Sequence, residues 1–88
     1  MIKKQTTVRC PQGLHLRVAS QVAKIAQASG NAVHIECEGC PRADACSVIE
    51  LLMLGATVGT TLQISAEGPA EEAVAEELAE FFEQGGGI

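Results

Sequence analysis

The sequence has no tryptophan and no tyrosine, and it contains only two phenylalanines among its 88 residues. Its core must therefore be aliphatic, and the hydrophobic fraction of 47% is large enough to supply one. No apolar run approaches the roughly 18 residues typical of a membrane-spanning helix. Residues 1–7 also lack the apolar stretch of a secretory signal peptide. We therefore expect a cytoplasmic protein with no membrane partner.

Basic residues are also scarce, with six Lys and Arg against eleven Asp and Glu, for a net charge of -5. Nucleic-acid-binding proteins usually carry the opposite balance, so the composition argues against that class. Proteins with basic or mixed surfaces are more suitable partners. The length suits one small domain, which we expect to span residues 1–88.

Alternating and helical patterns follow one another along the chain. The strand patterns alternate between apolar and polar residues, which is typical of an antiparallel sheet covered on one face. Gly30 and Gly55 are placed where helices should end, and Ser47 with Glu50 has the form of a capping box. We predict an α+β fold of order βαββαβα, with helices on one face of the sheet. The expected strands are 2–10, 32–37, 60–66 and a weak one over 42–45; the expected helices are 16–29, 47–54 and one from residue 71.

The segment Gly13 to Arg17 carries the strongest chemical signal. A strand ends, a glycine turns the chain, and a helix begins at or beside His15. The first amides of a helix lack intrahelical partners and attract anions, above all phosphate. Arg17 adds a planar cation that suits phosphoryl oxygens, and neutral imidazole is a good nucleophile near pH 7. These residues favour a phosphoryl site, although a histidine that merely caps the helix fits the spacing equally well.

The four cysteines are Cys10, Cys37, Cys40 and Cys46. Cys37 and Cys40 form a C-x-x-C motif on a chain reversal. Three interpretations stay open: ligands of zinc or an iron–sulfur cluster, a reversible disulfide, or free structural thiols. No second C-x-x-C is present, so the isolated motif favours free thiols.

Three segments together resemble the HPr family, the histidine-containing phosphocarriers of the bacterial sugar phosphotransferase system. They are GLHLRVA at 13–19, SVIELLMLG at 47–55, and residues 59–68. The resemblance implies an open-faced β-sandwich, a four-stranded antiparallel sheet with three helices on one face. It implies that His15 accepts phosphate from enzyme I, Arg17 assists, and an enzyme IIA receives the group. No metal or cofactor is implied, and we expect a monomer.

The resemblance also implies a regulatory and a docking role. Ser47 matches a serine that many members present to an HPr kinase/phosphatase, so it is a candidate phosphoserine. An apolar patch around the site engages donor and acceptor in the family, and its matching residues here are Leu16, Leu51, Leu52 and Met53. For Leu51, core packing is the alternative.

The chain departs from the family pattern in three places. Val18 stands where a proline is usual, Gln12 precedes Gly13, and the region before Ser47 is one residue longer and rich in cysteine. The leading hypothesis is a phosphohistidine carrier rather than a stand-alone enzyme. The alternatives are a regulatory protein that acts through Ser47, and a metal or redox module built on Cys37, Cys40 and Cys46.

Overall fold

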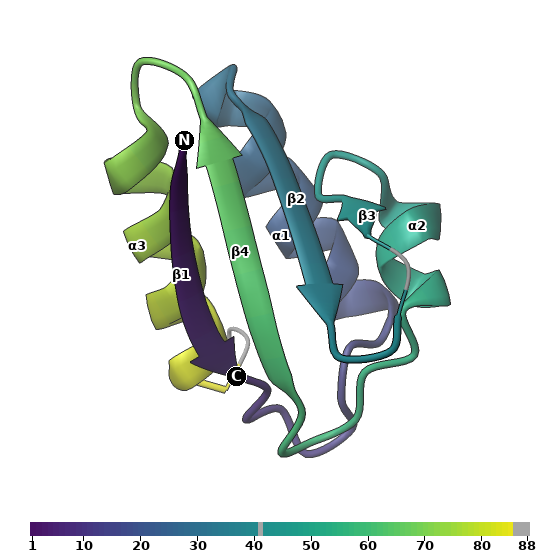
Figure 1. Ribbon diagram of the computed structural model, residues 1–88. Helices are drawn as coiled ribbons and strands as arrows, with labels where there is room; N and C mark the ends of the chain where they lie inside the picture. Colours follow the sequence, from purple (N-terminus) through teal and green to yellow (C-terminus); the bar gives the residue numbers. More distant parts are fainter. Residues whose placement is uncertain (41, 86–88) are drawn as a thin grey trace.

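The computed structural model describes residues 1–40 and 42–85. Its elements follow the predicted order, strand, helix, two strands, helix, strand, helix. Figure 1 shows the helices packed on one side of the sheet, with α2 beside the edge strand β3. The bounds are β1 Ile2–Thr7, α1 Leu16–Ser29, β2 Ala32–Cys37, β3 Ala43–Asp44, α2 Val48–Met53, β4 Thr61–Glu67 and α3 Glu71–Glu83.

The four strands form one antiparallel sheet in the order β1-β4-β2-β3. The predicted α+β fold, with three helices on one face, is confirmed. The first strand is shorter than its pattern predicted, because β1 leaves the ladder after Thr7. Backbone hydrogen bonds between Val8 and the turn at 59–60 continue the pairing for one more residue. The weak strand over 42–45 is reduced to Ala43 and Asp44.

The core is aliphatic, as the composition required, apart from the fully buried Phe82. In α1 the residues Val18, Val22 and Ala26 recur at helical spacing and are all buried. Gly30 ends the helix with φ 70°, in the left-handed region that glycine adopts without strain. None of the described helices has both the length and the apolar character needed to cross a membrane.

The uncovered face of the sheet is polar, but two of its residues are less exposed than their pattern predicted. Ser65 is 6% exposed, since Lys3 and His34 lie opposite it on the two neighbouring strands. His34 is half-buried between Ser65 and Asp44, its partner on β3. Cross-strand neighbours therefore cover polar positions that a single-strand pattern treats as solvated.

Candidate functional site

The turn before α1 is fixed by backbone contacts with a distant segment. Gly13 adopts φ +73°, and its N–H donates to Cys10 O at 2.9 Å. The next amide, Leu14 N–H, donates to Ala56 O, also at 2.9 Å. A Cβ on Gly13 would lie 2.6 Å from that carbonyl oxygen and 3.0 Å from Thr57 Cα. Residues 56–57 therefore form a rigid wall behind the turn, against which only glycine fits.

His15 is the N-cap residue of α1, with extended backbone angles (φ -95°, ψ 177°). Its carbonyl accepts the first helical bond from Ala19 N–H at 2.9 Å, but its side chain makes no capping hydrogen bond. His15 thus occupies the N-cap position, as the capping interpretation expected, but its side chain forms no capping hydrogen bond. The half-buried ring is instead available for chemistry at the helix N-terminus.

The start of α1 has the features of an anion site. Its first turn contains no acidic residue, and no side chain caps the amides of Leu16, Arg17 and Val18. Arg17 is exposed, and it forms no ion pair with any residue that the structure describes. The N-terminus of α1 and the Arg17 side chain, two residues after His15, therefore carry positive charge that no carboxylate of the described residues pairs with.

Val18 takes the place where the family pattern has proline, and the helix begins at Leu16 nonetheless. The Val18 side chain is 1% exposed and belongs to the core. Burial of an aliphatic side chain thus anchors the first turn here, whereas a proline would fix its φ angle.

Ser47 caps α2, as predicted, by accepting a hydrogen bond from Glu50 N–H at 3.2 Å. The second hydrogen bond of a capping box, from Ser47 N–H to the Glu50 carboxylate, is not formed. Glu50 Oε1 accepts from Asp44 N–H at 3.0 Å, while Ser47 N–H donates to Asp44 O at 2.9 Å. The tight β3–α2 connection thus redirects the Glu50 carboxylate to the Asp44 amide.

Four apolar side chains are exposed on α2 and at the start of α1, two helices that pack against each other. Met53 is 78% exposed, Ile49 72%, Leu16 62% and Leu52 37%. Leu51 is fully buried, so the alternative of core packing holds for it; α2 packs against α1 and β3. Ile49 was missed, although it stands four residues before Met53 and so shares its face of the helix. We call Leu16, Ile49, Leu52 and Met53 the apolar patch.

The cysteines separate into a pair and two free thiols. Cys37 and Cys40 form a disulfide, so the interpretation of these two as free thiols is wrong. Cys10 is fully buried and Cys46 half-buried, and both are free. Burial raises the pKa of both thiols, and for Cys46 the Asp44 carboxylate raises the pKa further. Within residues 1–40 and 42–85, no three His, Cys, Asp or Glu side chains are grouped to hold a metal ion.

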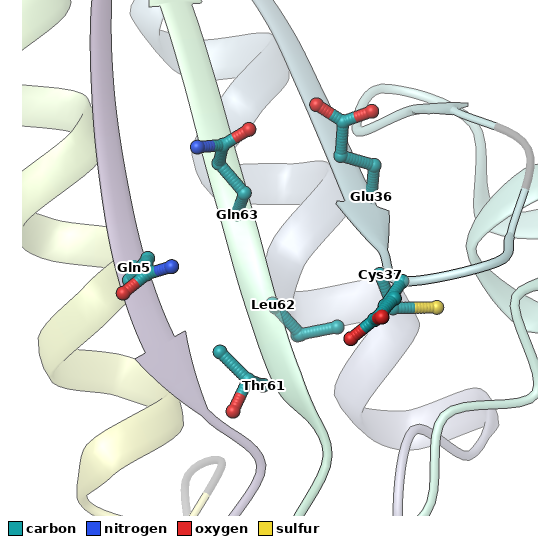
Figure 2. Close-up of a pocket in the computed structure, with 7 residues that line it drawn as sticks. Gln5, Glu36, Cys37, Thr61, Leu62 and Gln63 are labelled. Carbon is teal, nitrogen blue, oxygen red and sulfur yellow. The ribbon is translucent and has the colours of Figure 1, made fainter.

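The open face of the sheet carries a hollow of about 370 Å³, which does not involve His15 or Arg17. Figure 2 shows its polar side chains, Gln5, Gln63 and Glu36, on three neighbouring strands. The Cys37 side chain lies at the end of β2, with its sulfur directed away from these three groups. This hollow is therefore separate from the candidate phosphoryl site.

Comparison with known proteins decides the family. Residues 2–84 match the family model PTS-HPr, described as the PTS HPr component phosphorylation site. The chain belongs to the HPr family. The phosphocarrier protein HPr of Borreliella burgdorferi is 37% identical over 94% of this chain and 95% of its own length. That of Vibrio cholerae is 36% identical over 96% and 98%.

Solved HPr structures agree with the fold. A crystal structure of HPr-C-His from Thermoanaerobacter tengcongensis superposes with a TM-score of 0.92 at 25% identity, covering 100% of this chain and 98% of that one. HPr from Bacillus anthracis gives 0.86 at 26% identity, covering 92% and 95%. The chain is therefore an HPr phosphocarrier of the phosphotransferase system, and its interactions are with enzymes of that system.

Proposed function

We propose that His15 accepts a phosphoryl group from phosphorylated enzyme I and passes it to an enzyme IIA. One observation carries the proposal. The His15 ring makes no capping bond, yet it stands at a helix end whose amides and neighbouring Arg17 have no anionic partner among the described residues. Such a site favours a dianionic group on the imidazole, in a chain that otherwise carries a net charge of -5.

The transfer needs an imidazole nitrogen with a free electron pair. Following the family pattern we assign Nδ1 as the nucleophile, which requires the proton of the neutral ring to be on Nε2. A bond from Nδ1 to phosphorus forms as the donor's bond to phosphorus breaks. The helix amides and the Arg17 guanidinium then stabilise the charge on the phosphoryl oxygens. In the second transfer an acceptor nucleophile attacks phosphorus, and the bond from Nδ1 to phosphorus breaks.

The apolar patch is the proposed docking surface for both partners. It contains Leu16, the residue directly after His15, and the exposed face of α2. Exposed apolar side chains in a cluster are typical of protein interfaces, and a shared surface explains how donor and acceptor reach one ring in turn. We further propose that the chain acts as a cytoplasmic monomer, whose described residues form a single hydrophobic core.

Reconstitution of the relay tests the proposal. With phosphoenolpyruvate and enzyme I, the protein should gain the mass of one phosphate that is labile in acid. Addition of an enzyme IIA without fresh donor should then remove that mass and place it on the acceptor. No mass gain with an enzyme I that phosphorylates a reference HPr would contradict the proposal, and so would a gain that no enzyme IIA can discharge.

Replacement of Arg17 should slow transfer without unfolding the protein. Loss of a charged donor aimed at a transferring group costs roughly 100-fold in rate, so we expect that reduction in Arg17→Ala. Arg17→Lys should recover part of the rate, because a lysine keeps the charge but loses the planar fork. Quenched-flow phosphorylation gives the rates, and melting temperatures should stay within about 2 °C because Arg17 is exposed. Equal rates in all three proteins would exclude Arg17 from the site.

A charge in the apolar patch should weaken docking rather than chemistry. Met53→Asp is expected to raise the KM for enzyme I at least roughly tenfold, because an interface residue of this exposure is desolvated on binding. Ala73→Asp is the matched control, since it adds the same charge at an exposed position of α3. Titration of the carrier in the phosphorylation assay gives both KM values. An equal change of KM in the two variants would contradict the proposal that enzyme I binds to α2.

Phosphorylation of Ser47 by an HPr kinase/phosphatase stays a prediction of the resemblance. The Ser47 hydroxyl is half-buried and already caps α2. The Glu50 carboxylate, bound to the Asp44 amide, also lies close to the cap, where it would repel a phosphate. An acid-stable phosphate that is lost in Ser47→Ala would establish this modification.

A further inference from the structure

The Cys37–Cys40 disulfide closes a turn that is already held by its backbone. Cys37 is the last residue of β2, and the two Cα atoms are 5.3 Å apart. Cys40 N–H donates to Cys37 O at 3.0 Å, and Gly39 supplies the positive φ of +78° that the reversal needs. The turn therefore does not depend on the sulfur–sulfur bond, and opening that bond leaves the two sulfurs close enough to pair again.

The disulfide lies at a hollow on the surface of the protein. Both cysteines are half-buried and together line a hollow of about 390 Å³, whose other walls include Leu54 and Ala56. Cys37 also borders the hollow on the open face of the sheet. In Figure 2 its sulfur points toward β3 and α2, away from the polar side chains of that face. An external thiol can therefore approach the bond, which is the first requirement for exchange.

In the oxidised state the Cys40 sulfur packs against two backbone carbonyls. Cys40 Sγ lies 3.8 Å from Glu38 O and 4.0 Å from Leu54 O. A disulfide sulfur has no hydrogen to donate, so these are packing contacts in the oxidised protein. Reduction ends the bond that fixes the Cys40 sulfur in this position, since the two thiols must separate.

The other two cysteines are poor competitors for this exchange. Cys10 is fully buried, and its raised pKa keeps it a neutral thiol. Cys46 is half-buried, and burial together with the Asp44 carboxylate raises its pKa as well. Since the thiolate is the reactive form, both thiols should stay out of disulfide chemistry near neutral pH.

We propose that Cys37 and Cys40 are a reversible dithiol–disulfide site, reduced by an external dithiol, whose oxidised state braces the wall behind His15. A thiolate of the reductant attacks one sulfur, the Cys37–Cys40 bond breaks, and the departing sulfur takes up a proton. The second thiol of the reductant then attacks the mixed disulfide and releases the first sulfur as a thiol. Two electrons and two protons thus pass to the protein, and the reductant leaves as a disulfide.

The bracing follows from the residues that line the hollow. Ala56 is one of its walls, and Ala56 O accepts the hydrogen bond from Leu14 N–H. Leu54 O lies against Cys40 Sγ, two residues before Ala56. The disulfide and the turn that holds His15 therefore contact opposite ends of the segment 54–56. Opening the disulfide frees the Cys40 sulfur, which in the oxidised state is fixed against one end of that segment.

Thiol counting across graded dithiothreitol redox buffers tests the exchange. Folded protein is equilibrated, quenched in acid, and alkylated in denaturant with N-ethylmaleimide. Oxidised protein should show adducts only on Cys10 and Cys46, and reduced protein on all four cysteines, with a reversible transition. Cys46→Ala should keep the transition, whereas Cys37→Ser should carry an adduct on each remaining cysteine at every ratio. Four adducts at all ratios, or a disulfide mapped to Cys10 or Cys46, would overturn the proposal.

Amide hydrogen exchange tests the bracing in the same two redox states. We expect the Leu14 amide to exchange at least roughly threefold faster in the reduced protein, because its acceptor segment opens more often. The amide of Ala19, within α1, serves as the internal reference and should keep its rate. Equal Leu14 rates in the two states would contradict the bracing. This readout needs no phosphoryl donor, so it is independent of the proposed relay.

Discussion

His15→Ala is expected to abolish phosphorylation by phosphoenolpyruvate and enzyme I, with no residual mass gain. Alanine has no nucleophile, and the proposed anion site of the α1 amides and Arg17 supplies none in its place. The fold should survive, because the His15 ring is half-buried and makes no capping hydrogen bond. We therefore expect a melting temperature within about 3 °C of the parent.

His34→Ala is the matched control, since the chain has two histidines. His34 lies on the open face of the sheet between Ser65 and Asp44. The side chains of His15 and His34 are both half-buried. Its replacement should leave the phosphorylated fraction unchanged. If His15→Ala still gained acid-labile phosphate while His34→Ala did not, the assignment of the nucleophile would be wrong.

Gly13→Ala is expected to reduce both stability and transfer. The new Cβ would lie 2.6 Å from Ala56 O, in a backbone conformation of φ +73° that alanine rarely adopts. Strain of this kind, with backbone and not a flexible side chain as the obstacle, should lower the free energy of unfolding by about 3 kcal/mol. The turn can relieve the clash only by moving away from residues 56–57, which displaces His15 and should slow phosphorylation at least roughly tenfold.

Gly30→Ala separates the two causes of that loss. Gly30 has nearly the same φ of +70°, but a Cβ there meets nothing within 4 Å. Only the conformational penalty applies, so we expect a loss of about 1 kcal/mol and an unchanged transfer rate. Urea unfolding followed by circular dichroism gives the free energy of unfolding of the Gly13→Ala and Gly30→Ala variants. Equal losses in the two variants would mean that contact with residues 56–57 does not hold the turn.

The sequence predicted α1 with its exact bounds because two independent signals agree there. Val18, Val22 and Ala26 repeat at helical spacing, and Gly30 ends the pattern. In α2 the pattern is less informative, since five of its six residues are apolar and the period does not distinguish the faces. Packing against α1 and β3 decides that Leu51 is buried while Ile49 is exposed. Tertiary contacts therefore determine which residues of α2 are exposed.

The cysteine-bearing reversal could not be predicted for a different reason. A C-x-x-C motif is compatible with a metal site, a disulfide and free thiols, because its short spacing permits all three. The decisive facts are the 5.3 Å between the Cα atoms of Cys37 and Cys40 and the separate placement of the other thiols. Those facts depend on how β2 turns toward β3. The His15 site was more predictable, since a turn glycine, a helix start and an arginine are all local features.

Mapping of the phosphoryl group on the intact protein tests the central claim most directly. Protein phosphorylated by phosphoenolpyruvate and enzyme I can be observed at neutral pH by two-dimensional NMR of 15N-labelled histidines with phosphorus coupling. We predict coupling to one ring nitrogen of His15, an unchanged His34 ring, and return of the His15 signal to its original position when an enzyme IIA is added. Phosphorus coupling at His34, or phosphate on Ser47 with an unchanged His15 ring, would contradict the account.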